Sequence, residues 1–136
     1  MLEYPERIKG FIGIASAPDF TRDIEDALTP EQKNLLVKYG RIEIPNDYSE
    51  NPYVFTRDLL EDGLSQCVLN EKHSIAVPVT LLQGKQDADV LWQKALKIKD
   101  CFAGPNTDII FIEDGDHRLS RPQDLVLIDE NIRKFF

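Results

Sequence analysis

Two polar residues follow apolar stretches that are typical of buried strands. Asp87 comes shortly after Val77–Leu82, in the turn Gly84-Lys-Gln-Asp87, and His117 comes shortly after Thr107–Ile112, in Gly115-Asp-His117. In a parallel sheet, both would project from the carboxyl ends of strands, where the functional residues of α/β proteins gather. A carboxylate there can hold an imidazole in the tautomer that takes a proton from a nucleophile. The spacing therefore predicts an acid–histidine pair, provided that the two strands are neighbours.

Each residue of this pair also has a structural alternative. Asp87 could be a solvated turn carboxylate or a cap for the next helix, a role that Asp89 fills more naturally. His117, taken alone, could be a surface or structural histidine. His73 precedes the strand with no glycine or acidic residue in pattern, and we expect it to be exposed.

The acidic residues of the same region do not have metal-binding spacing. They lack the twelve-residue calcium loop and its closing Glu, so we interpret them as solvated loop carboxylates and expect no metal. No cofactor-binding motif is present either. The residues concerned are Asp108, Asp114 and Asp116.

The elements that must position the pair alternate along the chain. Apolar stretches without hairpin signals alternate with amphipathic ones, which predicts an α/β fold with a parallel sheet. Met1 to Arg7 is typical of the end of a helix, because its apolar residues have no N-cap residue before them. We expect strands at Lys9–Ser16 (a central strand), Val77–Leu82 and Thr107–Ile112, and helices at 90–102 and 123–136.

Between the first two strands, we expect residues 18–71 to form a lid-like insert, with an irregular pattern from Phe20 onward. Pro30 after Thr29 predicts a helix over Glu31–Tyr39 that Gly40 ends, and Val54–Gln66 again has helical spacing. Arg41–Pro45 alternates and Asn46–Pro52 is turn-like. Core packing is the main role we expect for the large apolar residues, although some could line an acyl pocket. The candidates for that pocket are Phe20, Tyr53, Phe55, Leu59, Leu60 and Trp92.

Composition excludes several classes of function. The 24 acidic and 16 basic residues give a formal charge of -8, which argues against nucleic acid or an anionic membrane as partner. The longest apolar runs are far below the about 20 residues of a membrane span. Cys67 and Cys101 have neither C-x-x-C spacing nor a disulfide framework, so we expect a reducing cytoplasm. An enzyme that uses either thiol is a minor alternative, because neither has a strand-end glycine or a nearby base in sequence.

Three segments resemble the α/β-hydrolase family. Val79-Thr-Leu-Leu-Gln-Gly-Lys-Gln-Asp87 and Asp114-Gly-Asp-His-Arg-Leu-Ser120 resemble its acid and histidine segments, and Arg7–Phe20 resembles the strand after the nucleophile-bearing helix. The version is similar to bacterial and mitochondrial acyl-thioesterase-like esterases, although Trp92 departs from the proline frequent there. The resemblance covers essentially the whole chain. It implies that Asp87 and His117 are the catalytic acid and base of a Ser-His-Asp triad.

The same resemblance implies that parts of the fold are missing. The family's chain order is Ser, then Asp, then His, but no G-x-S-x-G elbow occurs in the sequence. The loop that supplies one oxyanion-hole N–H would also precede Met1. Ser16 is a poor substitute, because Gly13-Ile-Ala-Ser16-Ala-Pro18 lacks the elbow glycines and lies one strand too late.

Two hypotheses follow from this comparison. The first is the carboxyl-terminal half of an ester or thioester hydrolase, inactive or nearly so alone. The second is a non-catalytic binding or oligomerisation domain derived from a hydrolase. Without the preceding strands, the Lys9–Ser16 strand is an open sheet edge. Its partner would be an amino-terminal hydrolase fragment or a second copy of the chain.

Overall fold

The computed structural model describes residues 3–46, 49–102, 104 and 107–136. The chain divides into two compact units. The sheet unit combines Met1–Ala17 with Leu69–Phe136, and the insert unit is Pro18–Val68. Among the described residues, no helix has the length and apolar character that crossing a membrane requires.

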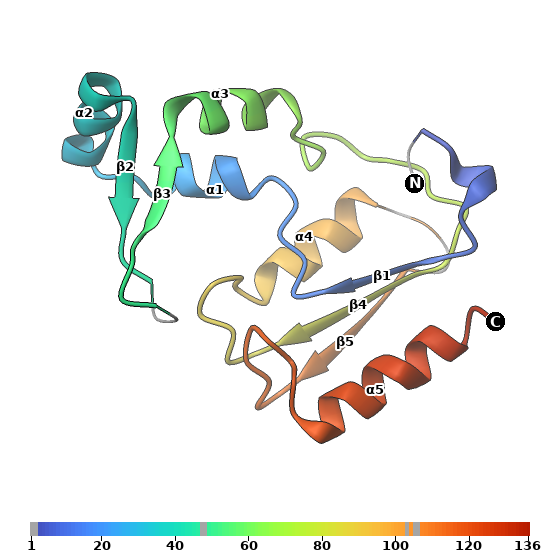
Figure 1. Ribbon diagram of the computed structural model, residues 1–136. Coiled ribbons are helices and arrows are strands. Elements are labelled where there is room, and N and C mark those ends of the chain that lie inside the picture. Colours follow the sequence, from blue (N-terminus) through green and yellow to red (C-terminus); the bar gives the residue numbers. More distant parts are fainter. Residues whose placement is uncertain (1–2, 47–48, 103, 105–106) are drawn as a thin grey trace. The chain divides into compact units, whose positions relative to one another are not determined.

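Among its described residues, the sheet unit has three parallel strands in the order β1-β4-β5. They are β1 (Phe11–Ile14), β4 (Val79–Gly84) and β5 (Thr107–Ile112), and Figure 1 shows them side by side. Strand β4 is flanked on both sides and is the most buried, as its run of apolar residues predicts. The parallel α/β prediction is confirmed. The expectation that the first strand is central is not met, because β4 is the central strand of this sheet and β1 pairs with β4 at its edge.

Two helices cover the sheet, α4 (Gln93–Cys101) and α5 (Pro122–Arg133), on opposite sides of it (Figure 1). Helix α4 buries Ala95, Ile98 and Cys101, which share one face at a spacing of three residues. Helix α4 begins later than predicted, because residues 87–92 still belong to the loop that follows β4. The predicted helix end at 1–7 is a short 3-10 helix, η1 (Pro5–Arg7), and Met1 and Leu2 lie outside the described residues.

In the described residues of the insert unit, the chain forms three helices and a two-stranded antiparallel sheet. Leu28, Ile42 and Leu60 form its buried core. Helix α2 follows the prediction: Thr29 caps it through Gln32, Pro30 begins it, and Gly40 with φ of 71° ends it. The elements are α1 (Phe20–Ala27), α2 (Pro30–Tyr39), β2 (Arg41–Ile44), β3 (Tyr53–Thr56) and α3 (Arg57–Ser65).

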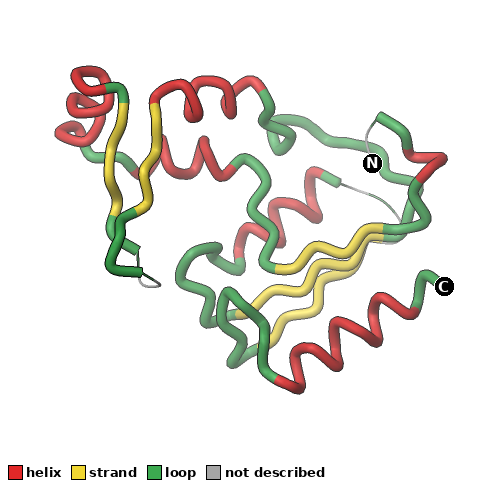
Figure 2. Tube along the Cα trace, viewed as in Figure 1, coloured by secondary structure: helices red, strands yellow, loops and turns green. Residues whose placement is uncertain are grey.

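Two predictions for the insert unit were wrong. The stretch Val54–Gln66 is not one helix: its first residues belong to β3, which pairs with β2 as a hairpin (Figure 2). Thr56 caps α3 by accepting a hydrogen bond from the Leu59 backbone N–H at 3.2 Å, so the helix cannot begin earlier. The absence of hairpin signals was therefore misleading here. Helix α1 also lies where an irregular chain was expected.

Candidate active site

The turn after β4 brings the two predicted residues together. The backbone N–H of Lys85 donates to the carbonyl of Ile112, and that of Gln86 donates to the carbonyl of Gly115, both at 2.9 Å. Gly84 allows this approach, since a Cβ at that position would overlap the carbonyl oxygens of Gly115 and Asp116. The turn that carries Asp87 is thus fixed directly to the loop that carries His117.

Asp87 turns its carboxylate into the protein. Oδ1 accepts hydrogen bonds from the backbone N–H of Asp89 at 2.9 Å and of Val90 at 2.8 Å, an arrangement that holds the turn closed. The side chain is 0% exposed, so the solvated alternative for Asp87 is wrong. Asp87 stabilises the turn through these bonds, and helix α4 begins only at Gln93, without a side-chain cap.

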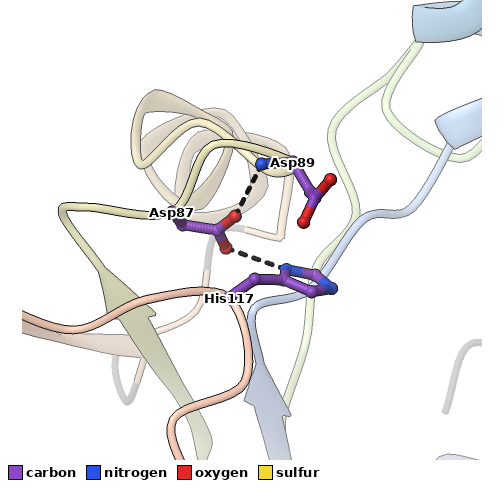
Figure 3. A group of neighbouring side chains, drawn as sticks. All are labelled: Asp87, Asp89 and His117. Atoms are coloured by element: carbon purple, nitrogen blue, oxygen red, sulfur yellow. Dashed lines mark hydrogen bonds and ion pairs between the residues drawn. The ribbon is translucent and has the colours of Figure 1, made fainter. Parts of the chain in front are cut away.

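His117 lies against this carboxylate. Its Nδ1 is 3.0 Å from Oδ2 of Asp87, and its side chain is 36% exposed. Figure 3 shows the second ring nitrogen on the side away from Asp87. With the proton on Nδ1 donated to the carboxylate, Nε2 is a proton acceptor. Strands β4 and β5 are neighbours in register from Val79↔Thr107 to Gly84↔Ile112, which is why residues 30 positions apart meet.

The loop that carries His117 is braced from within. Oδ1 of Asp116 accepts hydrogen bonds from the backbone N–H of Arg118 at 3.1 Å and of Leu119 at 2.9 Å. Leu119 adopts a left-handed conformation with φ of 42° and is almost fully buried. Burial of this side chain offsets the cost of that conformation and anchors the residue two positions after His117.

Arg121 joins the two ends of the same loop. Its guanidinium binds Asp114 at 2.6 and 3.1 Å and Asp124 at 2.8 and 2.9 Å. Asp124 is buried in the first turn of α5. Hydrogen bonds from Arg121 lower the pKa of Asp114 and of Asp124, and the bonds to Asp124 and Asp114 raise the pKa of Arg121. Asp114 is exposed, as expected of a solvated loop carboxylate, and it also forms an ion pair with Arg121.

Asp87, Asp89 and His117 each offer a possible metal-ligand atom, and these atoms lie within 4.8 Å of one another (Figure 3). The oxygens of Asp87 already accept hydrogen bonds from the backbone of Asp89 and Val90, from Gln83 and from His117. A carboxylate has about four acceptor positions, so a metal would have to displace one of these donors. The arrangement fits an acid–histidine pair better than a metal centre.

The other singled-out residues lie in different surroundings. His73 is half-buried and stacks on Phe102 at 5.0 Å, so the expectation of an exposed side chain was wrong. Cys67 and Cys101 are free thiols. Ser16 follows β1, which pairs with the opposite side of β4 from β5.

The six candidates for an acyl pocket divide into two groups. Phe20, Tyr53 and Leu59 are exposed. Three are packed: Leu60 and Phe55 belong to the insert core, and Trp92 lies edge-on to Phe111 at 5.7 Å.

Sequence reasoning missed Gln83. Its side chain is buried in β4, and its Nε2 donates to Oδ2 of Asp87 at 3.0 Å. The available signal was a polar residue within the apolar run Val79-Thr-Leu-Leu-Gln83, at a position that a buried strand normally fills with an apolar side chain.

Comparison with known proteins identifies the fold. No family model matches the chain. Two similar solved structures are a putative hydrolase from Agrobacterium vitis S4 (39% identity, TM-score 0.90) and the mouse α/β-hydrolase domain-containing protein 10 (29% identity, TM-score 0.87). They cover 93% and 99% of this chain. The chain therefore has the fold of the carboxyl-terminal portion of an α/β-hydrolase.

The curated proteins that match the chain share one name. The mouse mitochondrial palmitoyl-protein thioesterase ABHD10 is 30% identical over 125 residues, which is 91% of this chain, and the human protein is 26% identical over the same length. The chain spans only 42% of the mouse relative, and 49% and 56% of the two solved structures. It thus spans about half the length of the proteins that it matches.

Proposed function

We propose that Asp87 and His117 are the acid and the base of a serine-hydrolase triad that cleaves carboxylic esters or thioesters. The observation that carries this proposal is the 3.0 Å contact between a fully buried carboxylate and a half-exposed imidazole at neighbouring strand ends. Such a pair can take a proton on one side of the ring while the carboxylate stabilises the imidazolium on the other.

In the proposed reaction, Nε2 of His117 accepts the hydroxyl proton of a serine as its oxygen bonds to the substrate carbonyl carbon. His117 then gives that proton to the leaving alcohol or thiol, and the acyl–serine ester forms. Water attacks this ester by the same route, its proton passing through His117 to the serine oxygen, and releases the carboxylic acid. Asp87 keeps the imidazole in place throughout and stays ionised.

The serine would come from a segment outside these 136 residues, since the sequence has no G-x-S-x-G. We propose that the chain alone hydrolyses esters very slowly or not at all, because the members of a triad lose most of their value singly. The substrate class we favour is a long-chain acyl thioester, which the name of the mouse relative supports. The proposed compartment is the cytoplasm, and the two free thiols support a reducing one.

The test is a fusion protein. The amino-terminal portion of the Agrobacterium vitis hydrolase would be joined to this chain, which is 39% identical to the part it replaces. Hydrolysis of a p-nitrophenyl ester and of a palmitoyl thioester would be measured in the fusion and in the chain alone. We expect turnover only in the fusion, with His117→Ala or Asp87→Asn lowering kcat by roughly 10⁴-fold or more.

His73→Ala is the matched control, because His73 is the other histidine of the chain and should leave turnover unchanged. A folded, active fusion that is insensitive to His117→Ala would refute the proposed role of the pair. Turnover by the chain alone that disappears in His117→Ala would refute the proposed dependence on an added serine.

A second candidate is a non-catalytic domain that associates through β1. The observation that favours it is the edge position of β1: in the part of the chain that the structure describes, no strand pairs with its other side, and Phe11 and Ile14 are 40% and 42% exposed. The partner would be an amino-terminal hydrolase fragment or a second copy of the chain. Sedimentation of the chain as a monomer at micromolar concentration would argue against pairing with a second copy.

A further inference from the structure

Gln83 lies next to the carboxylate of Asp87 in the interior of the sheet unit. Its side chain is 1% exposed. Its Nε2 lies 3.0 Å from Oδ2 of Asp87, 3.0 Å from the carbonyl oxygen of Val90 and 3.2 Å from that of Gly84. One buried amide therefore touches the start of the Asp87 turn, its end and the carboxylate between them.

We propose that Gln83 is a positioning residue that sets the orientation of the Asp87 carboxylate toward His117. The inference rests on the proposed function for its importance in hydrolysis, but the contacts that carry it belong to this chain alone. Gln83 acts through Asp87, which in turn holds the imidazole.

The geometry assigns this role because Oδ2 is the shared acceptor. The backbone N–H groups of Asp89 and Val90 occupy Oδ1, whereas Gln83 and His117 both point at Oδ2. The terminal torsion of an aspartate is intrinsically broad and moves both carboxylate oxygens together, so donors on both oxygens hold it more tightly than donors on Oδ1 alone. A second donor on Oδ2, buried and attached to a rigid strand, restricts that torsion and leaves one direction open for the imidazole.

A purely structural role for Gln83 predicts something different. If the amide only satisfied the carbonyls of Gly84 and Val90, its loss would destabilise the turn but would not affect the state of the His117 ring. The tautomer of a histidine is set by the hydrogen bond that its ring makes, so the ring tautomer of His117 separates the two roles.

The experiment is ¹⁵N NMR of the histidine rings in the 136-residue chain, at a pH where the rings are neutral. The chain has only two histidines, so His73 serves as an internal reference. Gln83→Met removes the donor at similar side-chain length. Gln86→Met is the matched control, because Gln86 is an exposed glutamine of the same turn whose Nε2 contacts the carbonyl of Glu113 at 3.4 Å.

We expect the Nδ1–H tautomer of His117 in the natural chain and in Gln86→Met. In Gln83→Met, we expect loss of that signature, together with unchanged His73 signals. Exchange of the Asp89 and Val90 amides should also rise by roughly tenfold or more, as expected when a buried hydrogen bond is removed. An unchanged His117 tautomer in a folded Gln83→Met chain would overturn the proposal.

A measurement on the natural chain covers the case in which Gln83→Met does not fold. The side-chain amide protons of Gln83 should exchange with solvent at least about tenfold more slowly than those of Gln86, because they are held by buried acceptors. Equal exchange rates would overturn the proposal without any variant.

Failure of this inference is distinguishable from failure of the proposed function. An active fusion that depends on His117, combined with a Gln83→Met chain of unchanged tautomer, would remove the role of Gln83 only. A fusion without activity, combined with loss of the tautomer in Gln83→Met, would remove the proposed hydrolysis and support the positioning role.

Discussion

Different kinds of interaction stabilise the interior of the sheet unit and the interior of the insert unit. Within the described residues, the sheet unit has five buried polar or charged side chains and the insert unit has one, Thr21. Buried polar groups are tolerated only with partners, and such partners fix directions as well as distances. The five residues of the sheet unit are Gln83, Asp87, Thr107, Asp124 and Asn131.

The insert unit depends instead on a small apolar core and on helix caps. Leu28, Ile42 and Leu60 are buried, and Thr29 and Thr56 cap its second and third helices. Apolar contacts are non-directional, so this unit can tolerate changes in packing that the sheet unit cannot. The candidate pair Asp87 and His117 therefore lies in the unit whose buried polar groups make directional hydrogen bonds. If the two units fold independently, a change in the core of one should leave the structure of the other intact.

The largest effects are expected from matched leucine truncations in the two cores. Leu81 in β4 and Leu60 in α3 are both 2% exposed, and Leu→Ala at such sites costs about 2–5 kcal/mol. Hydrogen exchange should show Leu60→Ala loosening the insert unit while the His117 tautomer is kept. Leu81→Ala should loosen the sheet unit and lose that tautomer. Loss of the tautomer in Leu60→Ala would show that the two units fold as one.

An intermediate effect is expected from glycine replacements. In Gly84→Ala, the new methyl group meets the backbone carbonyls of Gly115 and Asp116, which cannot move away without separating the two loops. We expect a cost of about 1–3 kcal/mol in denaturant unfolding, and loss of the contact between Asp87 and His117.

Gly63→Ala is the control in the insert unit. The atoms nearest to its methyl group belong to the buried side chain of Thr21, which must shift, and the higher helix propensity of alanine offsets part of this cost. Equal destabilisation by Gly63→Ala and Gly84→Ala would contradict the contrast between directional and non-directional packing.

The smallest effect is expected from Asp114→Asn, which removes one of the two ion pairs of Arg121. Because Arg121 lowers the pKa of Asp114, the ionised carboxylate stabilises the fold at pH values above the ordinary pKa of an aspartate. This contribution is lost as the pH falls through the pKa that Asp114 has in the folded chain. The Tm of the natural chain should exceed that of Asp114→Asn by at most about 4 °C at pH 7. The two Tm values should converge toward pH 2.

Asp129→Asn removes the 2.6 Å pair with Arg133 on the surface of α5 and serves as a matched control. It should cause no change in amide exchange of the His117 loop. A Tm difference for Asp114→Asn that grows on acidification would show that the sign of the shift is wrong.

Much of the sheet unit could be predicted from the sequence, because its strands are continuous apolar runs ended by glycine-containing turns. The run Thr107–Ile112 coincides with β5, and β4 (Val79–Gly84) lies two residues later than the predicted strand Val77–Leu82. The insert unit was harder. Val54, Phe55, Leu59 and Leu60 have helical spacing, yet the first two pair with β2, a partner that no local pattern reveals.

The part of the candidate site that depends on the position of a residue after a strand could be predicted from the sequence. Asp87 and His117 each follow a buried strand, and strand pairing brings them into contact. Gln83 was not predictable in the same way, because its acceptors on Asp87 and Val90 come into reach only after the turn has folded. The catalytic role of the pair stays a prediction.

The two backbone hydrogen bonds from Lys85 to Ile112 and from Gln86 to Gly115 have a consequence for how this region can change in evolution. These bonds join the two turns directly, so the length of the stretch that carries α4 does not determine the distance between Asp87 and His117. We expect insertions and deletions to accumulate in that stretch among homologues, while the turns 84–87 and 112–117 keep their lengths. Loop-grafting designs can use the same freedom.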